Sequence, residues 1–403
     1  MLRHEIRHPV VNDSDFKIFK AFGARGWPHM VLVDPEGNMV GQVGGEGKYE
    51  VLDANIKRLV ETFDKDGKID RAEITFRLEE EKTPHLRFPG KIAATDDLLY
   101  IADSGHHRIV ITDHAGEVKE VIGNGKAGSD DGEYSDAQFH QPQGLAVSGD
   151  ELFVADTENH VLRRIDLKAK RVSTIAGTGK QVYGNRSGSA REVPLNSPWD
   201  VLLHESTLFI AMAGNHAIWS MDLAKGTIGP FAGDGRETLA DGPHRRASFN
   251  QPSGLAVIGD KLYVADSEVS GVRELDLEPP GATRTVVGTG LFDFGDVDGV
   301  GDAARLQHVL HVSAWEGKLL VADAYNHKIK LLDPKTRAVK SFLGDGKRGS
   351  EDGDKPRFNE PSGLAVAGGR LYVADTNNHS IRVIDLARKT VSTLQIKGLP
   401  SPK

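Results

Sequence analysis

The sequence predicts a mainly β chain, a six-bladed β-propeller preceded by a partial α/β module. Three observations lead to this fold class. An apolar pair followed by Ala-Asp, a short polar turn and Asn-His recurs in six diverged copies, and its Asp slot returns every 52 to 57 residues. Each copy also holds four short apolar strands separated by Gly, Asp, Asn and Lys. A fixed period of this size indicates stacked supersecondary units. Four antiparallel strands in each of six units match the strand count of a six-bladed β-propeller.

Residues 1–63 precede the repeats and predict the small module. Residues 15–22 have helical spacing, Trp27-Pro28 leads into an apolar strand, and Pro35-Glu36-Gly37 turns the chain into a second strand. Residues 51–63 then place apolar side chains on one helical face. Residues 64–85 are expected to be a linker, in which Ile74, Phe76 and Leu78 alternate as in an edge strand. The propeller is expected from residue 86 to 397.

The repeated Asp and His side chains are predicted to be structural. An Asp at a strand end can accept backbone N–H bonds in the following turn, and the His four residues later can reach the neighbouring strand. A catalytic site needs one or two distinctive residues, whereas a structural role in every repeat needs the same residue in each of them. The residues concerned are Asp103, Asp156, Asp266, Asp323, Asp375, His107, His160, His216, His327 and His379. Met212 in the third Asp slot is expected to be a packing substitution.

The repeats disagree at one innermost position, and this disagreement predicts the candidate site. Gly144, Gly254 and Gly363 share a slot that holds Lys91, Asp200 and His311 in the other three units, with Trp199 beside Asp200. We expect Lys91, Trp199, Asp200 and His311 to meet at one mouth of the axial channel and to bind a polar ligand. The alternative is that Lys91 and Asp200 form an ion pair that fills the channel, while Trp199 plugs it.

The acidic glycine loops between units suggest a weaker metal hypothesis. Asp296, Asp298 and Asp302 could offer oxygens to Ca²⁺. However, Asp-Gly is also a common turn dipeptide, and these loops recur at equivalent places. Sixteen histidines invite a zinc hypothesis, but no chelating spacing such as His-Glu-x-x-His occurs. We therefore predict no cofactor, with calcium or zinc as open alternatives.

Composition excludes several function classes. A net charge of −8 and the lack of a basic stripe argue against nucleic-acid binding. The sequence has no cysteine, which excludes thiol chemistry within this chain. No apolar run is long enough to cross a membrane, and residues 1–8 do not resemble a signal peptide. The expected location is the cytoplasm, unless the true N-terminus lies upstream.

The repeats resemble the NHL repeat, most closely at Asn159-His160-Val161-Leu162. The small module resembles the C-terminal half of a thioredoxin fold, in which Pro28 takes the place of the family's cis-proline. This order of parts, with phrases such as Ser197-Pro198-Trp199-Asp200, resembles the NHL-repeat-containing protein 2-like family. The resemblance implies a cysteine cluster in the thioredoxin part, which this chain lacks.

Three functions remain open. We expect a non-catalytic binding or scaffold protein that presents its channel mouth to a protein or small polar ligand, because no catalytic constellation stands out. The first alternative is the substrate-holding part of a thiol oxidoreductase whose redox segment is missing from this chain. The second is a metal-dependent propeller lyase or hydrolase.

Overall fold

The computed structural model describes residues 3, 6, 8–45, 47–72, 85–278 and 280–400. The chain divides into two compact units, Met1–Glu81 and Lys82–Lys403. The expected strand at Ile74, Phe76 and Leu78 lies outside the described residues.

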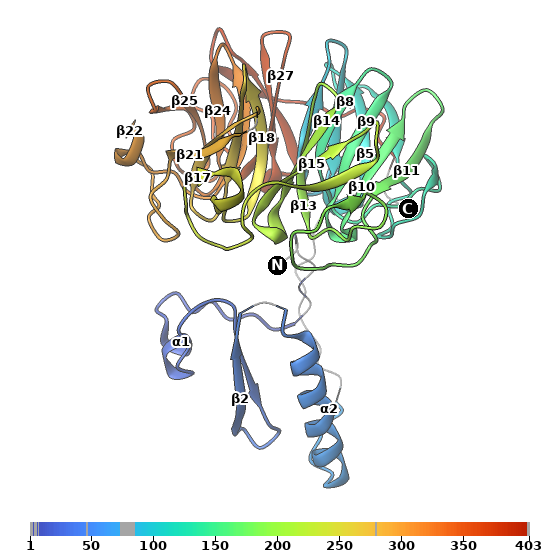
Figure 1. Ribbon diagram of the computed structural model, residues 1–403, viewed down its shortest axis with the longest axis vertical. Coiled ribbons are helices and arrows are strands. Elements are labelled where there is room, and N and C mark those ends of the chain that lie inside the picture. The colour runs from blue at the N-terminus through green and yellow to red at the C-terminus, as the bar shows by residue number, and fades with distance from the viewer. Residues whose placement is uncertain are drawn as a thin grey trace. The chain divides into compact units, whose positions relative to one another are not determined.

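The larger unit is a six-bladed propeller, as predicted, and each blade is an antiparallel meander (Figure 1). The first blade contains β3 (Ile92–Ala94), β4 (Leu98–Asp103), β5 (Arg108–Asp113) and β6 (Val118–Ile122). The second contains β8 (Pro142–Ser148), β9 (Glu151–Asp156), β10 (Val161–Asp166) and β11 (Arg171–Ala176). The third contains β13 (Pro198–His204), β14 (Thr207–Met212), β15 (Ala217–Asp222) and β16 (Thr227–Ala232).

The other three blades repeat this plan. The fourth contains β18 (Pro252–Ile258), β19 (Lys261–Asp266), β20 (Gly271–Asp276) and β21 (Ala282–Val287). The fifth contains β23 (Val309–Trp315), β24 (Lys318–Asp323), β25 (Lys328–Asp333) and β26 (Ala338–Leu343). The sixth contains β27 (Pro361–Ala367), β28 (Arg370–Asp375), β29 (Ser380–Asp385) and β30 (Thr390–Thr393). In each blade the first of these strands is the innermost.

Short elements complete the blades. Blades two to five each gain an outermost two-residue strand: β7 (Gly132–Glu133), β12 (Gly188–Ser189), β17 (Gly242–Pro243) and β22 (Gly299–Val300). A 3-10 turn follows the second strand of most blades: η2 (Ser104–His106), η3 (Thr157–Asn159), η4 (Ala213–Asn215), η7 (Ala324–Asn326) and η8 (Thr376–Asn378). Two others, η5 (His244–Arg246) and η6 (Gly301–Ala303), follow β17 and β22.

The core of the propeller lies between neighbouring blades. Apolar clusters join the first blade to the second, the second to the third, and so on around the ring. A further cluster, which includes Ile92 and Tyr372, joins the sixth blade back to the first. Each blade is therefore stabilised mainly by its two neighbours, as in other repeat proteins.

The ring is closed by hydrogen bonds as well as by packing. The N–H of Phe88 donates to Nδ1 of His379 at 3.1 Å, which links the entry of the first blade to the sixth. At the outer edge of the first blade, Lys397 pairs in parallel with Glu117, and the N–H of Val118 donates to the Lys397 carbonyl at 3.0 Å. The C-terminal segment thus adds to the blade that follows the N-terminal unit in the chain.

The smaller unit contains α1 (Lys17–Ala21), β1 (His29–Val33), β2 (Met39–Gly44) and α2 (Tyr49–Lys65). The predicted hairpin is confirmed, since β1 and β2 pair antiparallel across the turn that contains Gly37. The Trp27–Pro28 peptide bond is cis. None of the described residues in this unit is buried. Apolar side chains from α2 and the hairpin instead line a cavity of about 120 Å³.

Candidate ligand-binding channel

The repeated Asp side chains are fully buried, and each ties two distant parts of its blade together. One carboxylate oxygen accepts the backbone N–H of the residue 16 positions earlier, as in Arg87 to Asp103 at 2.6 Å and Asn359 to Asp375 at 2.6 Å. Asp156, Asp266 and Asp323 repeat this bond. The expectation of a local turn bond is therefore wrong for this oxygen, because its donor lies at the entry to the innermost strand.

A buried cation accompanies most of these Asp residues and was missed in the sequence analysis. It stands seven residues after the Asp in four blades, as Arg163, Arg273, Lys330 and Arg382, and all four side chains are 0% exposed. Arg163 and Arg382 donate to their Asp at 2.8 Å and Arg273 at 3.3 Å. The signal was available in the sequence, since the spacing of seven is the same in all four of these blades. In the first blade Arg108 serves the same purpose with a spacing of five.

The third blade replaces this ion pair with apolar side chains. Met212 stands in the Asp slot and Trp219 in the cation slot, and both are 0% exposed. Leu195 also stands where Phe139 and Phe358 stack against the arginines of their blades. The substitution at Met212 is therefore part of a matched apolar set. Such a set avoids the cost of burying two charges.

The fifth blade has the charges but not the contact between them. Nζ of Lys330 donates to Asp296 at 2.6 Å and to Asp298 at 2.8 Å, and no Lys330–Asp323 hydrogen bond forms among the described residues. Burial raises the pKa of Asp323 to about 7. A pKa above the unfolded value of 3.8 means that the folded state binds more protons. The stability supplied by this group is therefore lost as pH rises from about 4 to about 7.

We expect Lys330→Arg to give the ionised Asp323 the hydrogen bond that Lys330 does not make. A guanidinium can reach both Asp298 and Asp323, as Arg382 reaches Asp352 and Asp375. The variant should gain about 1 kcal/mol over the wild type near pH 8 and less near pH 5. Thermal unfolding at both pH values measures this difference. Lys328→Arg is the matched control, since Lys328 contacts Asp296 but not Asp323. Equal pH profiles for wild type and Lys330→Arg would contradict the assignment.

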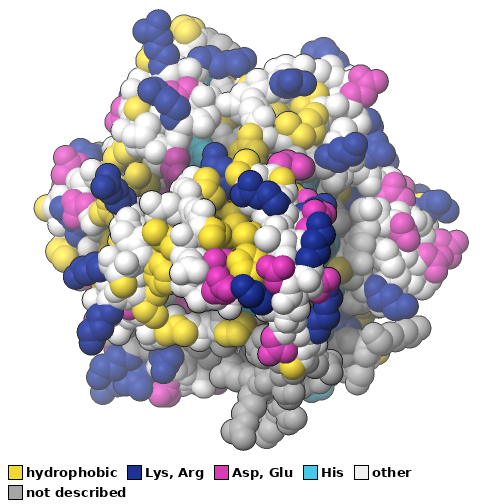
Figure 2. Space-filling model, turned by 90° about the horizontal axis from the view of Figure 1, so that it is seen from below, with side chains coloured by type: hydrophobic (Ala, Val, Ile, Leu, Met, Phe, Trp, Pro, Cys, Tyr) yellow, Lys and Arg dark blue, Asp and Glu magenta, His cyan; other side chains and the backbone are white. Residues whose placement is uncertain are grey.

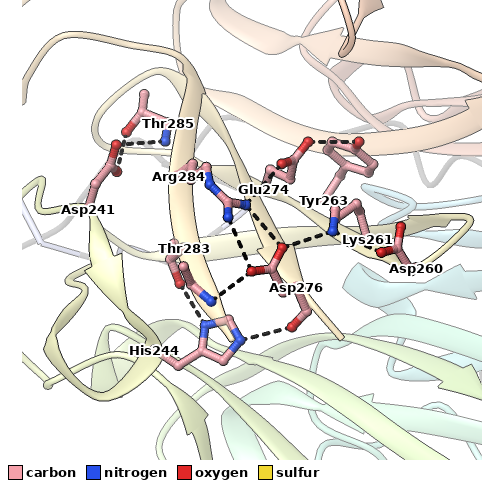
Figure 3. Close-up of polar contacts among 11 residues, drawn as sticks. Asp241, His244, Asp260, Lys261, Tyr263, Glu274, Asp276, Thr283, Arg284 and Thr285 are labelled. Carbon is pink, nitrogen blue, oxygen red and sulfur yellow. Dashed lines mark hydrogen bonds and ion pairs between the residues drawn. The ribbon is translucent and has the colours of Figure 1, made fainter. Parts of the chain in front are cut away.

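The hydrogen bonds that recur from blade to blade also account for the acidic glycine loops. In the fourth blade Asp241 accepts both the N–H and the hydroxyl of Thr285, at 3.0 and 2.7 Å (Figure 3). Asp298 makes the same pair of bonds with Ser341. Asp296 faces Lys328 and Lys330, and Asp302 faces Arg337 at 2.6 Å. These three candidate calcium ligands are thus each engaged by a cation, and they stay an untested hypothesis.

The repeated His residues link neighbouring blades. Each has a left-handed backbone, with φ between 49° and 53°. Nδ1 of His107 accepts the N–H of Gln141 at 3.2 Å, and His160 accepts that of Ser197 at 3.1 Å. His327 and His379 do the same for the blades that follow them. His216 occupies the equivalent position in the third blade.

The structure brings Lys91, Asp200 and His311 together on the propeller axis. Nδ1 of His311 accepts the N–H of Leu364 at 3.0 Å, so Nε2 carries the proton and donates to Oδ2 of Asp200 at 3.2 Å. The same Oδ2 accepts the N–H of Leu255 at 2.9 Å. Nζ of Lys91 donates to the carbonyl of Leu310 and, at 3.0 Å, to that of Ser362. Burial and the Lys91 charge lower the pKa of His311, which keeps its ring neutral.

The three glycines in the alternate slots make this arrangement possible. A Cβ on Gly144 would lie 2.4 Å from Cα of Asp200. One on Gly254 would lie 2.6 Å from Cα of His311, and one on Gly363 would lie 2.8 Å from Cα of Lys91. The alternation therefore has a steric cause, because neighbouring inner strands approach too closely for two side chains at one level.

Trp199 does not join the other three candidates. It is the extra residue of a β-bulge, since Pro198 pairs with Met212 and Asp200 with Ala211. Its side chain is half-buried and does not line the axial cavity. A bulged residue leaves the alternation of the strand, which the sequence does not reveal.

The channel is a cavity of about 320 Å³ lined by the innermost strands. Lys91, Asp200 and His311 are buried and form its floor. The residues at the opposite end of the same strands, including Val257, Val366 and the exposed Ala314, form its rim. The expectation that the three polar residues lie at the mouth is therefore wrong, because they stand near the start of strands whose other ends form the opening.

Metal binding receives no support from the described residues, which hold no cluster of three or more His, Asp or Glu side chains placed to ligate an ion. Over the same residues, no helix has both the length and the apolar character needed to cross a bilayer.

A profile of the NHL repeat matches residues 86–111, 139–164 and 358–384. NHL repeat-containing protein 2 from Bos taurus is 41% identical over 98% of this chain, and the match covers 60% of that protein. The chain thus contains NHL repeats and is similar to this protein over nearly its whole length. The chloroplastic protein Suppressor of quenching 1 from Arabidopsis thaliana is also 41% identical, over 100% of this chain and 41% of its own length. The chain thus spans about 60% or less of these relatives.

Among solved structures, a chain from the crystal structure of a nidogen/laminin complex aligns over 74% of this chain and 93% of its own, with 15% identity and a TM-score of 0.49.

Proposed function

We propose that this NHL-repeat chain is a non-catalytic binding module whose axial channel holds a small polar ligand. The observation that carries this proposal is that the polar side chains on the channel floor are already hydrogen-bonded within the protein. His311 uses both ring nitrogens, and Asp200 accepts two hydrogen bonds on one oxygen. A general base needs a free lone pair close to its substrate. His311 has none available, so binding fits this floor better than catalysis.

The fold supports a binding role in a second way. The channel is preformed by six blades whose packing does not depend on a ligand, which is typical of small-molecule sites. Its floor carries one ammonium and one carboxylate, so it favours neither anions nor cations. We also propose a cytoplasmic location, which rests on sequence composition alone.

Amide-resolved NMR of the deuterated chain tests this function. A fragment set with apolar, anionic, cationic and neutral polar members should include compounds that shift inner-strand amides saturably. Ala314→Trp should abolish these shifts, because Ala314 lies on the rim and is exposed. Ala169→Trp, at an exposed turn, is the matched control and should retain them. If no member of any class shifts the inner-strand amides, the binding function is wrong.

Asp200→Asn separates the floor's structural role from direct ligand contact. The variant keeps an oxygen for Leu255 but removes the negative charge that faces His311 beside the buried Lys91, so we expect a loss of about 1–3 kcal/mol in stability. If the floor contacts the ligand directly, binding of a fragment found by NMR should weaken as well. If the floor only fills the channel, binding should be unchanged.

A further inference from the structure

The wall of the channel consists of sheet edges rather than side chains. The innermost strand of each blade has a partner on one side only. The side chains of Leu145, Leu255 and Leu364 pack into the apolar clusters between blades. The surface that these strands present to the axis is therefore backbone, and an unpaired sheet edge carries N–H and C=O groups that can bind other molecules.

Two hydrogen bonds identify which backbone groups point into the channel. The N–H groups of Leu255 and Leu364 donate to Asp200 and His311 of the preceding blades, and not to the second strand of their own blades. In an antiparallel strand the groups that point away from the partner strand recur every second residue. Val257 and Val366 therefore point their N–H and C=O groups into the channel near its rim. The floor level is that of Leu255 and Leu364, and the rim level is that of Val257 and Val366. The register of the other blades places equivalent residues at these two levels.

Of the three pairs that the floor side chains form with the next blade, one leaves a backbone donor without a side-chain acceptor. Asp200 precedes Leu255 around the ring and accepts its N–H, and His311 does the same for Leu364. Lys91 precedes Leu145 in the third such pair. An ammonium group has no lone pair, so Lys91 cannot accept from Leu145. It donates to Leu310 and Ser362 instead.

We propose that the channel binds a small uncharged molecule with several hydroxyl groups, of the polyol or monosaccharide type. This inference rests on the proposed binding function. Each inward-pointing residue offers a donor and an acceptor side by side, and a hydroxyl group can both donate and accept. The two levels are about 7 Å apart, since two strand residues rise by that distance. A molecule of this class can contact both levels within a cavity of about 320 Å³. The floor holds one positive and one negative side chain, so its net charge gives a charged ligand no advantage.

Titrations followed by amide NMR test the inference, with glycerol, myo-inositol and glucose as probes and with inorganic phosphate, acetate and putrescine as charged comparators. We expect saturable shifts with at least one hydroxylated probe, confined to the innermost strands and including the Leu145 amide. Ala314→Trp should weaken this binding at least tenfold, and Ala169→Trp should leave it unchanged.

The outcomes separate the two proposals. Saturable inner-strand shifts with a charged comparator, and none with a hydroxylated probe, would overturn the ligand class and keep the binding function. Shifts that persist in Ala314→Trp would place the binding outside the channel and overturn the inference. An absence of shifts with all six probes, while an apolar fragment binds, would also overturn it. An absence of shifts with these probes and with the whole fragment set would overturn both proposals.

Discussion

Arg382→Met should lower the free energy of unfolding by about 3–5 kcal/mol, and the apparent Tm by roughly 5–8 °C. Arg382 is 0% exposed, and its guanidinium joins Asp375, Asp352 and two backbone carbonyls. Its loss leaves the buried Asp375 carboxylate without a cation. Thermal and urea unfolding measure the change. Arg388→Met is the matched control, because its side chain is 81% exposed and lies 3.7 Å from its acid.

The third blade supplies a sharper test of the same prediction. Combining Asp375→Met with Arg382→Trp and Phe358→Leu transplants the apolar set of Met212, Trp219 and Leu195 into the sixth blade. If the cost of Arg382→Met comes from an unpaired buried charge, this triple variant should recover most of the stability. A triple variant less stable than Arg382→Met would show that the hydrogen bonds of Asp375 to the backbone dominate instead.

Gly254→Ala should destabilise the propeller by about 3 kcal/mol or more. The added Cβ would lie 2.6 Å from Cα of His311 and 2.8 Å from the carbonyl oxygen of Leu310, so the obstacle is backbone and cannot rotate away. Circular dichroism and thermal unfolding measure the effect. Gly295→Ala is the matched control, since its nearest neighbour would be Cβ of Arg305 at 3.4 Å.

The cause of the effect can be checked with a second substitution. His311→Gly removes the imidazole but leaves its Cα in place, so it should not rescue Gly254→Ala. Rescue would mean that the side chain of His311, and not the close approach of β18 and β23, requires glycine at this slot. Wild-type stability of Gly254→Ala alone would contradict the close packing of the inner strands.

Most of the candidate site could be predicted from one position at which the repeats differ in residue type. Lys91, Asp200 and His311 stand out because they occupy every second copy of a slot that is otherwise glycine. Their meeting on the axis follows from the six-fold ring, since alternate blades stand about 120° apart and their innermost residues converge on the axis. Trp199, the neighbour of Asp200, was expected to join them and does not, because a β-bulge moves it off the alternation. The backbone donors of Leu255 and Leu364 could not be predicted, since every residue carries such groups and only register decides where they point.

The sequence by itself determined the number of blades, their strands and the residues that repeat in them. A period of 52 to 57 residues with four apolar segments has few physical solutions, because each unit must bury its faces against neighbours. Only the tertiary structure decided which polar groups are satisfied. The double engagement of His311 and the depth of the channel floor depend on differences of a few tenths of an ångström in the distances between strands. Hydrogen bonds have so short a range that the residue types at these slots do not show which bonds form.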